Sequence, residues 1–309
     1  MMTWKLWRVL KAPPYDDPIF RRSSQNYQPP SRWRQVLDYL VWIVVIALFV
    51  GYLRQTFVSL STDLSPIIIF VGIIALGGTI YGVDWALAIS DTVALARENN
   101  TLDLLCITPR GAIGAVWALG LSQLHRASNF HNRNTSRRRV FFSLGTGLLL
   151  ISIALGGMML TVRNANLLPL LDLTALFVAV LSSFALLVAA YVDYIQSIVV
   201  SLLVGMIIPT FSRQRFDTQV WALSGFLTVQ LGTYFVTYLV CFVILPTIVR
   251  TFGIENLTLE LILLLPRLIV FSLIREVLIV LLWRGLVLHF NEELRVSAPG
   301  SKPSFGKRV

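Results

Sequence analysis

The chain has 309 residues, of which 56% are hydrophobic and only 14% are charged. Soluble domains carry about 25% charged residues, so the composition excludes an ordinary soluble domain and indicates a membrane protein. The formal net charge is +10, but no compact basic domain remains beside the apolar segments, so we expect no nucleic-acid partner.

Residues 1–35 form a basic N-terminal segment that we expect in the cytoplasm. Near its start, apolar and basic residues alternate at a spacing of three: Trp4, Lys5, Trp7, Arg8, Leu10 and Lys11. This spacing separates an apolar face from a basic one and favours a short helix lying on the cytoplasmic leaflet. A disordered basic tail is an equally good interpretation of the same residues.

Apolar runs of about 20 residues, enough to cross a hydrocarbon core of about 30 Å, occur six times in residues 36–290. They lie near 36–53, 66–90, 140–162, 167–192, 221–249 and 259–282. The sequence therefore predicts an all-α, polytopic membrane bundle of about six transmembrane helices, followed by a basic tail over 291–309. Two stretches, 194–211 and 257–275, could either span the membrane or lie at its interface.

The distribution of Lys and Arg predicts the orientation, because cytoplasmic loops keep the excess of basic residues. Residues 1–35 and the loop 91–139 each hold seven, whereas the connections on the opposite side hold one each. Both termini are therefore predicted in the cytoplasm. We expect the chain to cross a bacterial-type cytoplasmic (inner) membrane several times. A second crossing at 194–211 would place Arg213 and Arg215 outside, so we expect a helix at the cytoplasmic interface there.

Among the charged residues within or at the ends of predicted spans, four are candidates for a functional role: Asp84, Asp193, Arg275 and Glu276. Such groups are costly in lipid, so they should face protein, water or one another. Arg275 and Glu276 are adjacent and point about 100° apart on a helix, so they cannot pair with each other. Arg275 could instead reach Asp84 or Asp193. Structural pairing, contact with another subunit, and a substrate or proton path all remain open as roles.

No motif for catalysis or cofactor binding is found. The sequence lacks a phosphate-binding Gly-x-x-x-x-Gly-Lys-Ser/Thr loop, a His-Glu-x-x-His metal helix and a Cys-x-x-Cys-His haem site. We therefore expect no enzyme activity, metal or cofactor in this chain, and any ATP hydrolysis would belong to a partner subunit.

Residues 93–109, within the cytoplasmic loop 91–139, combine charges with leucines in a pattern compatible with an interfacial helix. The segment ends at Thr108-Pro109, because proline disfavours a helical conformation in the residue before it. A solvated surface turn without a partner is the alternative interpretation.

This segment resembles the permease subunits of ABC-2 type exporters, which follow their second span with Glu-x-x-Gly-Thr-Leu-Glu-Leu-Leu and then Thr-Pro. The matching residues here are Glu98, Thr101, Leu102, Asp103, Leu104, Leu105, Thr108 and Pro109. Asn100 replaces the glycine of the motif, and Asp103 replaces its second glutamate. A 14-residue apolar stretch, 111–124, stands where the family passes almost directly into its third span.

The resemblance implies that residues 97–109 are a coupling helix that docks on a separate ATPase subunit. Arg97, Glu98 and Asp103 would then make polar contacts with the ATPase, while the leucines hold the helix against the bundle. It also implies a homodimer, or a heterodimer with a second permease, in the lipid bilayer. From a different class, a cofactor-free accessory subunit of a large membrane complex would use the same surfaces for docking.

Overall fold

The computed structural model describes residues 1–12, 17–24, 65–99, 101, 111–126, 146, 170–211, 214–251 and 256–296. They are helical and contain no strand, which confirms the predicted all-α class for this part of the chain. The main helices are α1 (Met2–Lys11), α2 (Pro18–Ser24), α4 (Ser65–Glu98), α6 (Gly111–Arg126), α8 (Leu170–Ile207), α9 (Arg215–Tyr238), α10 (Leu245–Arg250) and α11 (Asn256–Val296). A 3-10 turn, η1 (Ile208–Thr210), follows α8, and a π-helix, η2 (Leu239–Ile244), joins α9 to α10.

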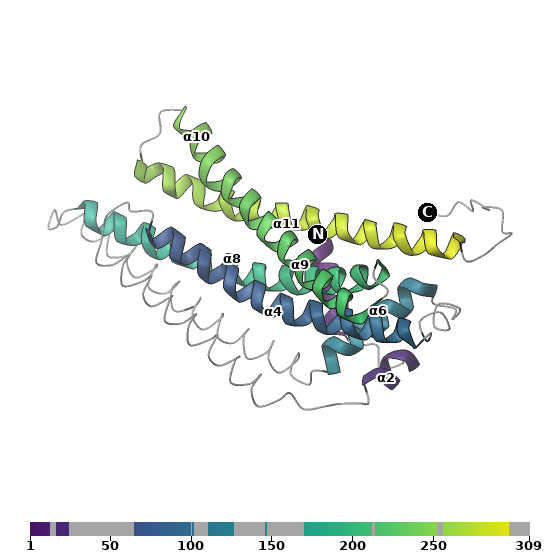
Figure 1. Cartoon of the computed structure of the whole chain (residues 1–309). Coiled ribbons are helices and arrows are strands. Elements are labelled where there is room, and N and C mark those ends of the chain that lie inside the picture. Colours follow the sequence, from purple (N-terminus) through teal and green to yellow (C-terminus); the bar gives the residue numbers. More distant parts are fainter. Residues whose placement is uncertain are drawn as a thin grey trace.

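Long helices form the body of the molecule, with α8 packed against α4, α9 and α11 (Figure 1). The shorter helices α1, α2 and α6 lie around the half of the bundle in which α4 and α11 end (Figure 1). The core consists of aliphatic side chains from α4, α6 and α8, joined by aromatic residues from α1, α2, α9 and α11.

Two helical segments of the described chain are long and apolar enough to cross a membrane, judged by length and composition. They are Leu187–Thr210 and Arg215–Val249. Helices α4 and α11 cover the predicted spans 66–90 and 259–282. The predicted spans 36–53 and 140–162 lie outside the described residues, as does the basic tail after residue 296.

Helix α8 corrects one expectation. The preferred interpretation of 194–211 was an interfacial helix that follows the span 167–192, but α8 runs without a break from Leu170 to Ile207, so the two stretches are parts of one helix. Its residues from Asp193 to Met206 are buried among other helices. The physical reason is that no proline occurs in this stretch before Pro209, and the charge rule orients loops without limiting how far a helix continues. Helix α11 is likewise continuous through Pro266.

Helix α1 is formed, which favours the helical interpretation over a disordered tail, but its buried face differs from the predicted one. Leu6, Trp7 and Leu10 are buried, whereas Trp4 is 41% exposed. The stripe at positions i, i+1 and i+4 that includes Leu6 therefore packs on the bundle, and Trp4 lies on the outer side with the basic residues.

Two glycines of α4 allow close helix packing. A Cβ atom at Gly82 would collide with the ring of Phe226 from α9, and one at Gly78 would collide with the carboxylate of Asp193 from α8. Close approach at small residues is a common way for apolar helices to associate.

Candidate functional site

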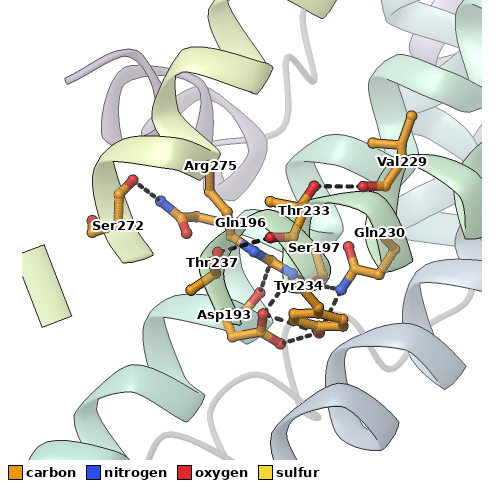
Figure 2. Close-up of polar contacts among 10 residues, drawn as sticks. All are labelled: Asp193, Gln196, Ser197, Val229, Gln230, Thr233, Tyr234, Thr237, Ser272 and Arg275. Carbon is orange, nitrogen blue, oxygen red and sulfur yellow. Dashed lines mark hydrogen bonds and ion pairs between the residues drawn. The ribbon is translucent and has the colours of Figure 1, made fainter. Parts of the chain in front are cut away.

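An ion pair between α8 and α11 lies at the centre of the described bundle. Arg275 Nη2 is 2.6 Å from Asp193 Oδ1, and each side chain is only 1% exposed. Arg275 Nη1 also donates hydrogen bonds to the backbone oxygen of Asp193 at 3.2 Å and to Ser197 Oγ at 3.0 Å (Figure 2). One arginine therefore contacts two successive turns of α8.

Helix α9 completes this polar cluster. The hydroxyl of Tyr234 lies 3.1 Å from both carboxylate oxygens of Asp193, and Gln230 Nε2 donates to Tyr234 Oη at 2.6 Å and to Ser197 Oγ at 3.0 Å (Figure 2). The guanidinium carbon of Arg275 lies 4.9 Å from the centre of the Tyr234 ring, within the range of a cation–π interaction. We call Asp193, Ser197, Gln230, Tyr234 and Arg275 the central polar cluster.

The central polar cluster holds four helices together. Helices α8, α9 and α11 supply its side chains, and α4 covers it at Gly78, where a side chain would displace Asp193. The opposite charges balance, and each carries further hydrogen bonds, which is the condition under which buried ions are tolerated. Such an arrangement can fix the register of the helices. Elsewhere in the described residues, no group of three or more His, Cys, Asp or Glu is placed to hold a metal ion.

The structure separates the four predicted intramembrane charges into different sites. Arg275 pairs with Asp193, whereas Asp84 lies on an exposed position of α4. Glu276 points elsewhere, as the 100° offset predicted: its carboxylate accepts hydrogen bonds from the backbone N–H groups of Met2 and Thr3 and from Thr3 Oγ1. A carboxylate from α11 therefore caps the N-terminus of α1, where helical N–H groups lack partners.

Of the nine residues predicted to contact an ATPase, Arg97, Glu98 and Thr101 lie within the described chain. The others, Leu102, Asp103, Leu104, Leu105, Thr108 and Pro109, lie outside it. Arg97 Nη1 donates to the carbonyl oxygens of Pro209 at 2.7 Å and Thr210 at 2.9 Å. Its guanidinium therefore caps the end of η1, an internal role that the sequence did not predict, whereas Glu98 is exposed.

A second link between α4 and its neighbours involves Asp91. Arg215, at the start of α9, binds the Asp91 carboxylate through both Nε and Nη2, the latter at 2.6 Å, and Gln219 Nε2 donates to the same carboxylate at 3.0 Å. The hydrogen bond from Arg215 is the main reason that the pKa of Asp91 lies below its ordinary value of 3.8. The sequence does not indicate this pair, because its members are 124 residues apart and neither lies in a motif.

Arg267 occupies a third site that the sequence analysis did not single out. In the π-helix η2, the N–H of Leu245 bonds to Val240, and Pro246 has no N–H to donate. The carbonyl of Cys241 instead accepts a hydrogen bond from Arg267 Nε at 3.2 Å, with the guanidinium 4.9 Å from the Phe242 ring centre. A proline and an arginine in neighbouring apolar runs were the signals for this contact.

No model of a known protein family matches the chain, and neither the curated proteins nor the solved structures provide a match.

Proposed function

We propose that this chain is the membrane-spanning permease subunit of an ABC-2-like exporter, with six spans and both termini in the cytoplasm of a bacterial-type inner membrane. A separate ATPase subunit would dock on residues 97–109, and two copies, or one copy with a second permease, would enclose the pathway. The proposal rests on the resemblance at Glu98 to Pro109. One structural observation supports it most: the end of α4 that leads into this segment is braced to both α8 and α9.

These contacts determine which helices would follow a displacement of α4. Arg97 binds the end of η1, which continues α8, and Asp91 binds Arg215 and Gln219 at the start of α9. The buried Ser90 hydroxyl adds a longer contact, 3.4 Å, to the backbone oxygen of Thr218. A push on residues 97–109 would therefore move α4 together with α8 and α9, because all three are joined within two turns of the pushed end.

The central polar cluster would extend that movement to α11. Arg275 is anchored on α8 by three contacts and packs against Tyr234 of α9. Separating α11 from α8 would leave two buried charges without their partners, which costs several kcal/mol. The helices are thus expected to move as one unit when the ATPase changes state.

The test is isolation of the chain in mild detergent with its bound partners, which are then identified by mass spectrometry. We expect an ATPase subunit in fixed ratio, and we expect the double variant Glu98→Ala/Asp103→Ala to lose it. Asp217→Ala is a matched control, because Asp217 is an exposed acidic residue at the start of α9, outside the proposed docking segment. If the double variant retains the ATPase as well as the control does, the coupling role is wrong.

A cofactor-free accessory subunit of a large membrane complex is the second candidate function. In such a complex, the large apolar side chains that α9 and α11 expose along their length, among them Leu231, Phe235, Leu273 and Leu281, would pack against neighbouring subunits instead of lipid. The same isolation would then yield a stoichiometric set of membrane proteins that contains no ATPase.

A further inference from the structure

Helix α1 is attached to the bundle by its apolar side. Leu6, Trp7 and Leu10 belong to the hydrophobic core, and Leu10 is fully buried. The helix contacts both α8 and α11. Its apolar stripe is therefore already covered by protein and is not available to insert between lipid chains.

Both ends of α1 are held by side chains from other helices. The Glu276 carboxylate of α11 caps its first N–H groups, and His125 of α6 lies with Nε2 2.8 Å from the carbonyl oxygen of Leu10. Phe20 of α2 packs edge-on against the same histidine, with ring centres 5.8 Å apart. These contacts fix which side of α1 faces outward, and they place α2 beside its C-terminal end.

The exposed sides of α1 and α2 carry positive charge. Basic side chains on α1 and α2 are exposed: Lys5, Arg8, Lys11, Arg21 and Arg22. Trp4 lies on this side too, 41% exposed. Within the described residues 1–12 and 17–24, the acidic residue is Asp17. It is buried, and its carboxylate accepts a hydrogen bond from the backbone N–H of Ile19 at 3.0 Å. We call these five basic residues and Trp4 the α1–α2 basic face.

We propose that the α1–α2 basic face binds the anionic phospholipid headgroups of the cytoplasmic leaflet. The proposal rests on the membrane location argued above, but not on transport or on an ATPase. Clustered Lys and Arg beside a membrane are attracted to anionic lipids, and a tryptophan is favoured at the level of the headgroups. Because the apolar stripe is occupied by protein, the attraction acts through charge, so the face selects anionic over zwitterionic headgroups.

The test uses the purified full-length chain in detergent, with phosphatidylglycerol or phosphatidylcholine added, and native mass spectrometry to count bound lipids. We expect Lys5→Gln/Arg8→Gln/Lys11→Gln to weaken phosphatidylglycerol binding about tenfold or more and to leave phosphatidylcholine binding unchanged. The matched control, Lys302→Gln/Lys307→Gln/Arg308→Gln, removes the same number of charges from the tail and should bind like the wild type. Equal retention of phosphatidylglycerol by the α1 variant, or equal loss by the tail control, would overturn the proposal.

A second measurement follows the salt dependence of phosphatidylglycerol binding and needs only the wild-type chain. In the wild-type chain, salt of about 1 M shortens the screening length to about 3 Å and should release most of the phosphatidylglycerol, whereas binding that is insensitive to salt contradicts a charged face. Extraction of native membranes with alkaline carbonate tests the premise separately. A chain released by carbonate contradicts the membrane location, while one that stays in the membrane but lacks lipid selectivity contradicts this inference alone.

Discussion

The guanidinium of Arg275 and the carboxylate of Asp193 meet at 2.6 Å across 82 residues of sequence, with both side chains almost completely buried. Both side chains are shielded from bulk solvent, so each charge depends on the other and on the neutral hydrogen-bonding groups around them. This mutual dependence makes each member of the pair sensitive to substitution of the other.

Removing one partner of this pair should be far more harmful than removing both. We expect Asp193→Asn or Arg275→Met to lower the free energy of unfolding by about 3–5 kcal/mol, because each leaves an uncompensated buried charge or its unpaired partners. The double variant Asp193→Asn/Arg275→Met should lie closer to the wild type than the sum of the single losses. Unfolding in mixed detergent micelles, followed by circular dichroism, measures all three. Additive losses would show that the two charges act independently.

The contact between Gly82 and Phe226 should show coupled packing. Gly82→Ala places a methyl group where the Phe226 ring lies and should cost about 1–3 kcal/mol, whereas Phe226→Leu in the same chain should recover part of that loss by making room. Gly232→Ala is the control, since a Cβ there meets nothing within 4 Å. Because alanine favours a helix over glycine, the control should gain about 0.5–1 kcal/mol. Thermal unfolding of the wild type and the three variants supplies the comparison, and a loss at Gly82 that Phe226→Leu does not change would argue against direct contact.

The brace between Asp91 and Arg215 should depend on pH. The pKa of Asp91 is lowered in the folded chain by the hydrogen bond from Arg215, so the stabilisation is fully present above the unfolded value of about 3.8 and is lost as the pH falls through the lower, folded value. The pair is partly exposed, so we expect only about 0.2–1 kcal/mol. The difference in unfolding free energy between wild type and Asp91→Asn, measured at pH 7 and again near pH 3, should shrink in acid. A difference that does not change with pH would assign the effect to packing.

Arg97 and Glu98 are neighbours in sequence but should respond differently. Arg97→Ala removes the donor from the carbonyls of Pro209 and Thr210 and should cost about 1.5–3 kcal/mol, the range for a hydrogen bond to a charged group. In the Arg97→Ala variant, backbone amide hydrogen exchange should accelerate around η1. Glu98→Ala, at an exposed position, should change stability by less than about 0.5 kcal/mol. Equal exchange rates in the two variants would contradict the capping role of Arg97.

Local sequence patterns predicted those features of the described chain that depend on short-range periodicity. The helical class, the helix at 2–11, and the possibility that Arg275 meets Asp193 follow from apolar runs, three-residue spacing and the cost of a charge in lipid. The choice between Asp84 and Asp193 could not be made, because it depends on how α4 and α8 rotate about their own axes.

The remaining features depend on tertiary packing. Arg97 was predicted to contact a partner, but its acceptors are backbone carbonyls 112 and 113 residues away. Every residue has a backbone carbonyl, so residue types do not show which carbonyl will accept a hydrogen bond. The buried stripe of α1 was misassigned because Trp4-Trp7-Leu10 and Leu6-Trp7-Leu10 have equally good helical spacing. Only the fit of Leu6 and Trp7 against the bundle decides between them.

Helix α11 has a mechanical consequence within the proposed membrane arrangement. Its 41 residues extend about 61 Å, roughly twice the thickness of the hydrocarbon core. A helix of that length projects well beyond the membrane at ordinary tilts. It would act as a lever, with one part in the hydrocarbon core and the other in water. A tilt of about 5° around its midpoint would shift each end by about 2.7 Å, close to the 2.6 Å that separates Arg275 Nη2 from Asp193 Oδ1. Pro266 lies inside α11 and has no N–H to donate to the helix. The helix would therefore bend first at this residue.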